Sequence, residues 1–361
     1  MSDEYAIQVM NLTKYYGKLL AVDHIDLEVN PGEVFGFLGP NGAGKTTTVK
    51  MLNTLLEPTG GKAYIFGYDV SRQPYQAKRQ FGVVPEESNV YTEISTWDNM
   101  IFTARLYRIP GSEQKRRIDE LLELMELQGK KNDKVFTLSK GMRQRLSLAM
   151  ALIHRPSVLF LDEPILGLDV HSSRIINNQI RQLNTEGTTI FLTTHQIEMA
   201  DELCHRVAII NHGQIAAVET PERLKAAVEG KRSVEITMGN GGYTKECAGL
   251  AGLSGVKQAV RNGDKVRLFT SDPPTVLRGV MGYIQERNLP VVAINTTGPS
   301  LEDVFVDITG RPIGAPRRKF ASEQCKGCPV REDCESEKEA TDSGQAPKKH
   351  GGGFLKGSCE R

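Results

Sequence analysis

Residues 39–47, GPNGAGKTT, have the types and the spacing of a loop that binds phosphate. They satisfy the pattern G-x-x-x-x-G-K-[ST] and lie between a predicted strand and a predicted helix. Glycines let successive backbone N–H groups converge on one anion, and the helix N-terminus adds its partial positive charge. We therefore predict that these residues bind a nucleotide: Gly39, Pro40, Asn41, Gly42, Ala43, Gly44, Lys45, Thr46 and Thr47.

A lysine, a hydroxyl and two carboxylates extend this chemistry. Lys45 can reach the β- and γ-phosphates, and the Thr46 hydroxyl can ligate Mg²⁺. A second stretch, SVLFLDEP (157–164), is an apolar strand that ends in Asp162 and Glu163. Adjacent side chains on a strand point to opposite sides, so we expect Asp162 to face Mg²⁺ and Glu163 to act as a general base on water. Acid pairs also end strands as a polar exit from a core, but a phosphate loop in the same chain favours catalysis.

The elements that must position these residues alternate between strand and helix. VFGFLG (34–39) and SVLFLD (157–162) are short apolar runs bounded by turn formers, which is typical of buried strands. VAIINHGQIAAV (207–218) predicts a hairpin that turns at His212–Gly213. The alternation from residue 5 to about 220 predicts a mixed α/β domain with a largely buried sheet.

The character of the chain changes after this first domain, which we place at residues 1–224 with a helical subdomain at about 90–155. Residues 225–312 alternate strand-like and helix-like segments and predict a small α+β domain. Ser300 and Asp303 have capping-box spacing, so a helix is expected to begin there. Residues 313–361 are rich in Pro, Gly, Lys and Glu, which indicates a flexible tail.

Composition limits the classes of function. A chain of 361 residues with 39% hydrophobic and 25% charged residues is typical of a globular protein with more than one domain. No apolar run approaches the roughly 18 residues needed to span a bilayer, and the acidic N-terminus lacks a signal pattern, so we expect a cytoplasmic protein. A net charge of +1 supplies no general field for nucleic acid.

The tail contains a cysteine cluster, CKGCPVREDC, at residues 325–334. Cys325, Cys328 and Cys334 form C-x2-C-x5-C, and Cys359 is available as a fourth ligand. The pattern resembles that of some iron–sulfur sites, and C-x2-C also begins many zinc sites. Metal binding and reduced thiols in a tail remain alternatives. Two further cysteines, Cys204 and Cys247, lie within predicted domains and are interpreted as small buried residues.

A third motif, LSKGMRQRLSLAMAL (138–152), lies between the phosphate loop and the acid pair. In order and spacing the set resembles the nucleotide-binding domain of ABC transporters, which implies an ABC-type P-loop NTPase fold with a mixed sheet core and a helical subdomain. LSKGM corresponds to the family signature LSGGQ, where Ser139 and Gly141 begin a helix that binds the γ-phosphate of ATP held by the opposite subunit. The physics is that of a capped helix N-terminus facing an anion.

The same resemblance assigns three further residues. Tyr16, in KYYGK, falls where the family stacks an aromatic ring on adenine. Asp169, in GLD, belongs to the D-loop that lines the dimer seam, and His195 corresponds to the switch histidine that contacts the γ-phosphate. By themselves, Tyr16 and His195 would be interpreted as an ordinary surface tyrosine and a structural histidine.

Two motifs depart from the family pattern. Glu86 stands where the family usually has a Gln that touches Mg²⁺ and the attacking water. Glu86 can still ligate Mg²⁺, but it adds negative charge near the γ-phosphate. Lys140 and Met142 replace Gly and Gln of the signature, while the Ser and the second Gly are retained. We interpret both changes as compatible with turnover.

The resemblance implies an ATPase that works as a homodimer or heterodimer of ATP-binding subunits, with ATP and Mg²⁺ at the seam, driving separate transmembrane permease subunits from the inner face of the cell membrane. Docking is expected at about 86–110, where Trp97, Met100 and Ile101 are either core residues or part of a docking cleft. Residues 225–310 resemble the accessory domain of drug- and daunorubicin-resistance exporters, which favours export.

Two other classes of function are alternatives. A soluble ABC ATPase that acts on nucleic acid or ribosomes usually has two cassettes or a long coiled-coil insertion, and the sequence contains neither. A regulatory module that does not hydrolyse ATP would not need the full catalytic set. No nucleic-acid partner is expected.

Overall fold

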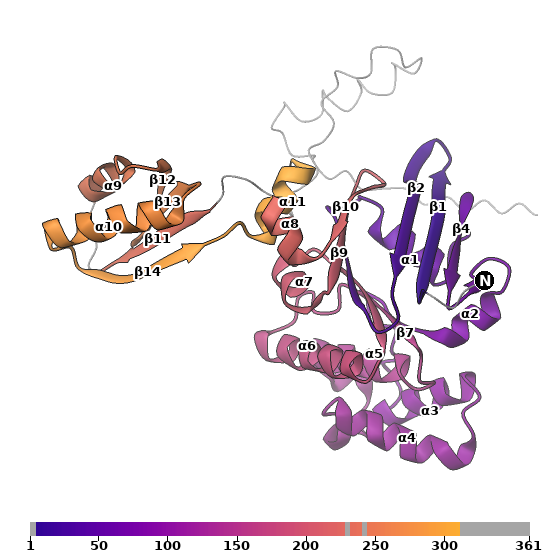
Figure 1. Cartoon of the computed structure of the whole chain (residues 1–361). Coiled ribbons are helices and arrows are strands. Elements are labelled where there is room, and N and C mark those ends of the chain that lie inside the picture. Colours follow the sequence, from indigo (N-terminus) through magenta and orange to yellow (C-terminus); the bar gives the residue numbers. More distant parts are fainter. Residues whose placement is uncertain (1–4, 228–231, 240–243, 311–361) are drawn as a thin grey trace, which may run out of the picture. The chain divides into compact units, whose positions relative to one another are not determined.

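The computed structural model describes residues 5–227, 232–239 and 244–310 (Figure 1). The first 227 residues contain two sheets and a group of helices, in the alternating order expected from the sequence. The sequence-predicted tail, with its four cysteines, lies outside the described residues.

A six-stranded sheet carries the phosphate loop and the acid pair, in the strand order β10-β9-β3-β8-β7-β6. All neighbours from β9 to β6 are parallel, and β10 pairs antiparallel with β9. The strands are β3 (Val34–Leu38), β6 (Phe81–Val84), β7 (Val158–Asp162), β8 (Thr189–Thr194), β9 (Arg206–Asn211) and β10 (Gln214–Glu219). Every residue of β3, β7 and β8 is buried; the apolar runs predicted this for β3 and β7, and the predicted hairpin is confirmed as β9–β10.

A second, antiparallel sheet has the order β2-β1-β4-β5, and its long strands stand side by side in Figure 1. Its strands are β1 (Ile7–Tyr16), β2 (Leu19–Val29), β4 (Gly60–Ile65) and β5 (Tyr68–Asp69). One hydrophobic cluster joins apolar residues of this sheet, among them Ile7 and Leu12, to Phe35, Phe160 and Phe191 of the parallel sheet. The Phe35 and Phe191 rings stack at 5.8 Å between centroids, so aromatic packing adds to the burial of this layer.

The helices of the first 227 residues cover the sheets and form a helical region. They are α1 (Lys45–Leu52), α2 (Pro74–Gln80), α3 (Thr96–Leu106), α4 (Gly111–Leu124), α5 (Lys140–Ala151), α6 (Val170–Thr185), α7 (Ile197–Leu203) and α8 (Pro221–Ala227), with short 3₁₀ helices at Gln128–Lys130 and Val135–Thr137. A second hydrophobic cluster joins α3, α4 and α5 to one face of the parallel sheet. The helical region is thereby tied to the strands that carry the phosphate loop and the acid pair.

Residues after 232 contain a four-stranded antiparallel sheet in the order β12-β13-β11-β14. Its elements are β11 (Ser233–Met238), α9 (Thr244–Ala251), β12 (Val256–Asn262), β13 (Lys265–Thr270), α10 (Pro273–Arg287) and β14 (Val291–Thr297). A separate hydrophobic cluster packs the sheet against its helices, and its buried residues include Val234, Ile236, Val266, Leu268 and Val280. These elements therefore have a hydrophobic core of their own.

The last described helix, α11 (Leu301–Thr309), begins with the capping box predicted at Ser300 and Asp303. Its apolar face, Leu301, Val304 and Phe305, joins the same hydrophobic cluster as α7 and α8. Among the described helices, none is both long enough and apolar enough to cross a lipid bilayer.

Candidate functional site

The predicted catalytic groups follow four neighbouring strands at one edge of the parallel sheet. In the order β3-β8-β7-β6, the strands lead into the loop before Lys45, into His195, into Asp162 and Glu163, and into Glu86. The register aligns these ends, because Leu38 pairs with Thr194 and Asp162 pairs with Thr193. The carboxyl edge of a parallel α/β sheet is where such folds bind ligands. Lys45 and His195, which are 150 positions apart in the chain, thus follow neighbouring strands at the same edge of the sheet.

The phosphate loop depends on glycine at three positions. Gly42 and Gly44 have φ angles of 81° and 112°, which side chains with a Cβ adopt only with strain. A Cβ at Gly39 would lie 2.5 Å from the carbonyl oxygen of Ile210. Helix α1 has no side-chain cap at its N-terminus, so its first N–H groups face the loop and are suited to an anion.

Lys45 is the first residue of α1 and is buried. Its Nζ donates a hydrogen bond to the carbonyl oxygen of Gly39 at 2.6 Å, which folds the side chain back over the loop. Burial lowers the pKa of Lys45 and is the largest influence on it. The negative charges of Glu163, Asp162 and Glu86 act in the opposite direction and stabilise the ammonium form. Lys45 therefore lies in the field of all three carboxylates.

The acid pair is separated by a turn. Strand β7 ends at Asp162, and Glu163 has a left-handed φ of 49°, so the expectation that strand alternation separates the two side chains is wrong. One threonine fixes both residues: the Thr193 hydroxyl donates to Oδ1 of Asp162, and the Thr193 carbonyl accepts from the Glu163 N–H at 3.0 Å. Oε1 of Glu163 lies 2.8 Å from Nδ1 of His195. The left-handed conformation of Glu163 thus directs its carboxylate towards His195, while the carboxylate of Asp162 accepts a hydrogen bond from Thr193.

Three oxygen-bearing side chains fit Mg²⁺, which binds carboxylate and hydroxyl oxygens. The carboxylate of Asp162 is oriented by Thr193 and lies at the end of β7. The Thr46 side chain is exposed in the first turn of α1, and Glu86 is exposed beyond β6. Each can present an oxygen without breaking an element, so the donor set suits a hard divalent cation.

The signature motif begins helix α5 as predicted. Oγ of Ser139 accepts a hydrogen bond from the N–H of Met142 at 3.2 Å, which caps the helix. A Cβ at Gly141 would lie 2.2 Å from Oγ of Ser172, so only glycine lets α5 pack so closely on α6. Asp169 caps α6 by accepting from the N–H and the hydroxyl of Ser172, and these bonds lower the pKa of Asp169. The signature and the D-loop are therefore one packed unit.

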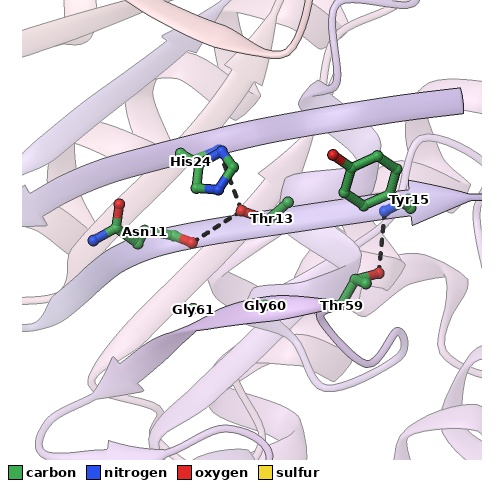
Figure 2. A pocket seen from close by; sticks show the side chains of 7 residues that line it. All are labelled: Asn11, Thr13, Tyr15, His24, Thr59, Gly60 and Gly61. Atoms are coloured by element: carbon green, nitrogen blue, oxygen red, sulfur yellow. Dashed lines mark hydrogen bonds between the residues drawn. The ribbon is translucent and has the colours of Figure 1, made fainter.

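Tyr16 ends β1 and is 46% exposed, and Nζ of Lys14 lies 5.6 Å from the centroid of its ring. The preceding residue, Tyr15, lines a pocket on the antiparallel sheet that does not include Tyr16 (Figure 2). Tyr16 is not among the residues that line this pocket, and its role as a stacking surface for adenine stays a prediction.

The pocket in Figure 2 has a volume of about 310 Å³ and was not predicted from the sequence. Its lining residues are Asn11, Thr13, Tyr15, His24, Thr59, Gly60 and Gly61. Its polar atoms largely bond to one another: the Thr13 hydroxyl donates to the Asn11 carbonyl at 3.1 Å and accepts from the His24 N–H at 3.3 Å. We therefore assign no ligand to it.

The predicted docking residues are mostly core. Met100 is fully buried, and Trp97 and Ile101 are partly buried against the same hydrophobic cluster. Lys131 covers the Trp97 ring, with Nζ 4.0 Å from its centroid. On α3 the helical period turns Phe102 instead to the surface, together with Leu106.

Of the two cysteines outside the tail, Cys204 is a small buried residue as predicted, whereas Cys247 is not fully buried. Cys204 is buried beside Gly36, and burial raises the pKa of its thiol, while Cys247 is half-buried. Within the described residues, no group of three or more His, Cys, Asp and Glu side chains could hold a metal ion. Cys325, Cys328, Cys334 and Cys359 lie outside them.

Comparison with known proteins decides the family. The ABC transporter family model matches residues 22–166. The chain is 37% identical over 309 residues to a daunorubicin resistance ATP-binding protein, DrrA2, of Streptomyces coeruleorubidus, covering 85% of this chain and 96% of that protein. It is 35% identical to the Nod factor export ATP-binding protein I of Rhizobium etli, covering 85% and 94%. The chain belongs to the ABC transporter ATP-binding proteins.

Solved structures of this family match about three-fifths of this ABC ATPase. A dimeric cassette in a post-hydrolysis state, bound to ADP and phosphate, is 27% identical with a TM-score of 0.55, covering 59% of this chain and 98% of that one. The protein cbiO1 of Clostridium perfringens, part of the transporter complex cbiONQ, is 26% identical with a TM-score of 0.58, covering 62% and 92%. The chain is thus an ATP-hydrolysing subunit of an ABC transporter, and proteins of this family use Mg²⁺ with ATP.

Sequence reasoning missed two residues that orient the site of this ABC ATPase. Thr193 holds the acid pair, and Ser172 joins the signature to the D-loop. Both are small hydroxyl residues in unremarkable contexts. Thr193 meets the acid pair from a neighbouring strand, and the contact of Ser172 with Gly141 comes from a different helix, so no local pattern could have indicated these two contacts.

Proposed function

We propose that Glu163 is the general base for ATP hydrolysis and that Lys45 and His195 complete the catalytic set. The 2.8 Å contact between Glu163 and His195, at the sheet edge that holds Asp162 and the phosphate loop, carries this proposal. Glu163 accepts a proton from water as the water oxygen attacks the γ-phosphorus. The bond from that phosphorus to the bridging oxygen breaks, giving ADP and phosphate.

The remaining residues of the site bind and orient. The loop Gly39–Thr47 holds the phosphates, Tyr16 stacks on adenine, and the other ring nitrogen of His195 contacts the γ-phosphate. Bound Mg²⁺ neutralises charge on the phosphates, and we assign it to Asp162, Thr46 and Glu86. Because Glu86 lies in the electrostatic field of Lys45, its extra charge is partly balanced within the site.

We further propose that each ATP lies between two subunits. Ser139, Lys140, Asp169 and Val170 are exposed, Val170 to 75%, along the N-termini of α5 and α6. An exposed apolar residue beside capped, anion-ready helix ends suits a surface that closes on a partner. Ser139 and Gly141 would meet the γ-phosphate held by the opposite subunit, with Asp169 lining the seam. Two copies of this chain, or this chain with a second ATP-binding subunit, would supply both sites.

The partners driven by this cycle are separate membrane-spanning subunits, and the chain works at the inner face of the membrane. We place docking beside Glu86, at the exposed rings and chains of Tyr91, Phe102 and Leu106. The direction proposed is export. Relatives named for drug resistance and Nod factor export match 85% of the chain, more than the 59–62% matched by the cassette structures, so the likeness to them extends into the small domain.

Glu163→Gln tests the proposal. The substitution keeps shape and removes the basic carboxylate, so phosphate release should fall at least about 100-fold while ATP affinity stays within twofold. Size-exclusion chromatography with light scattering should show an ATP-dependent dimer that persists. Glu123→Gln, at an exposed carboxylate on α4, is the matched control. Normal turnover by Glu163→Gln would remove Glu163 from its role.

For the tail, we propose that Cys325, Cys328, Cys334 and Cys359 bind zinc or an iron–sulfur cluster. Cysteine spacing is the support for it. Anaerobically purified protein should contain close to one equivalent of zinc or a visible iron–sulfur absorbance band, lost in Cys325→Ser/Cys328→Ser. Metal-free protein with reduced thiols would contradict it.

A further inference from the structure

Lys140 departs from the glycine of the family signature, and its side chain makes a specific contact. Nζ of Lys140 donates a hydrogen bond to the carbonyl oxygen of Leu166 at 2.6 Å. Leu166 lies in the loop between the acid pair and Asp169. The bond therefore joins the first residue of α5 to the loop that follows β7, across a separation of 26 residues.

The geometry of the loop leaves room for this lysine. Gly167 has a φ of 66°, and a Cβ there would lie 2.8 Å from Nζ of Lys140. A side chain at residue 167 would thus displace the ammonium group, besides straining the backbone. Gly167 both makes the turn and opens the space through which Lys140 reaches Leu166.

Electrostatics also call for a partner at this place. A positive charge in the first turn of a helix is unfavourable, because the N-terminal end of the helix is itself partly positive. Lys140 is the first residue of α5, so its charge gains nothing from its own helix. The carbonyl oxygen of Leu166 accepts a hydrogen bond from Lys140 and so offsets the unfavourable position of this positive charge.

The contact continues to the proposed general base. The N–H of Leu166 donates to the carbonyl oxygen of Glu163 at 3.1 Å, and the Glu163 side chain meets His195. Two hydrogen bonds thus connect Lys140 with the backbone of Glu163. The residues next to Lys140 in the chain, Ser139 and Gly141, are those assigned to the ATP of the opposite subunit.

We propose that Lys140 is a positioning residue that ties the signature helix to the loop carrying Glu163. In a dimer, the signature of one chain faces the ATP of the other, whereas Glu163 serves the ATP of its own chain. A γ-phosphate held by the signature would therefore, through Lys140 and Leu166, favour one geometry of Glu163 at the second site. This inference rests on the roles proposed above for Ser139, Gly141 and Glu163.

Lys140→Met and Lys140→Arg test it in the full chain. Methionine keeps the length and removes the donor, whereas arginine keeps donors. Without nucleotide, Lys140→Met should speed hydrogen exchange of the backbone amides at residues 165–168 at least about threefold, because their tether is lost. Lys140→Arg should restore slow exchange. Lys134→Met, at another exposed lysine of the helical region, is the control and should leave exchange unchanged.

Kinetics provide the second readout. Lys140→Met should lower kcat about threefold to tenfold with the Kd for ATP within twofold, and should bring the Hill coefficient for ATP down towards one. Unchanged exchange and unchanged cooperativity in Lys140→Met, or a wild type without cooperativity, would overturn the proposal. The exchange measurement contains no nucleotide, so it fails separately from the role of Glu163, which Glu163→Gln tests on its own.

Discussion

The N-termini of α1 and α5 offer the same chemistry to a phosphate, but they are completed differently. Each helix begins with a lysine whose Nζ donates to a loop carbonyl at 2.6 Å, Lys45 to Gly39 and Lys140 to Leu166. At α1 the cap is a left-handed glycine without a side-chain bond, and the lysine is buried. At α5 the cap is Ser139, which already accepts an N–H, and the lysine is exposed.

The difference separates the two tasks of an ABC ATPase. Helix α1 has its own glycine loop and a lysine in the electrostatic field of three carboxylates, which suits the proposed binding of nucleotide within one chain. Helix α5 presents a capped, exposed end packed on α6, and in the proposed dimer this end meets a phosphate only when a second subunit arrives. Binding should therefore depend on α1, and dimer closure on α5.

Lys45→Met is expected to have the largest effect on this division. A charge-assisted hydrogen bond contributes about 1.5–3 kcal/mol, so the Kd for ATP should rise about 10- to 100-fold. Isothermal titration of the monomer measures it, and dimerisation should be lost as a consequence. Lys50→Met, in the exposed last turn of α1, should bind ATP normally. Unaltered ATP affinity in Lys45→Met would contradict the expectation that nucleotide binding depends on the N-terminus of α1.

Gly141→Ala should have a smaller effect, confined to α5. The added Cβ would lie 2.2 Å from Oγ of Ser172, so α5 and α6 must separate at a cost of about 1–3 kcal/mol in unfolding free energy. In a Glu163→Gln background, ATP should bind as before but yield fewer dimers by light scattering. Gly129→Ala, where a Cβ meets nothing within 4 Å, is the matched control. Equal dimer formation in both variants would show that α5 packing is not required for closure.

The smallest effect concerns pH and the far end of α5. His154 follows that end, its ring stacks on Tyr107 at 3.7 Å, and burial lowers its pKa to about 4. Nε2 contacts the Phe81 carbonyl at 3.0 Å, and Nδ1 is buried without a partner among the described residues. Because the unfolded chain binds the proton more readily between pH 6.5 and 4, stability should fall as pH drops through this window, by about 0.8 kcal/mol from pH 7.5 to 6.

Urea denaturation at the two pH values measures this difference, with His154→Gln as the comparison. The variant starts less stable because it loses the ring stack, but it should lose about 0.8 kcal/mol less on acidification. ATP affinity at α1 should change equally in both proteins. A variant with the wild-type pH dependence would assign the acid sensitivity to another group.

Local patterns predicted the parts of this chain whose physics is local. The phosphate loop, the buried strands β3 and β7, the β9–β10 hairpin and the capped start of α11 all depend on residues within a few positions. Met100 shows the limit: which face of α3 is buried depends on the helices packed against it, so the sequence left core and docking as alternatives. Glu163 shows another, because a single left-handed residue replaced the expected strand alternation.

By itself, the sequence determined which groups could bind phosphate and where their helices begin, because glycine spacing and caps act over one turn of chain. Tertiary structure decided their use. Thr193 reaches Asp162 across 31 residues, and Lys140 reaches Leu166 across 26. Such contacts arise only when parallel strands and packed helices bring distant segments together, since their geometry is set by sheet register and close packing rather than by neighbours in the chain.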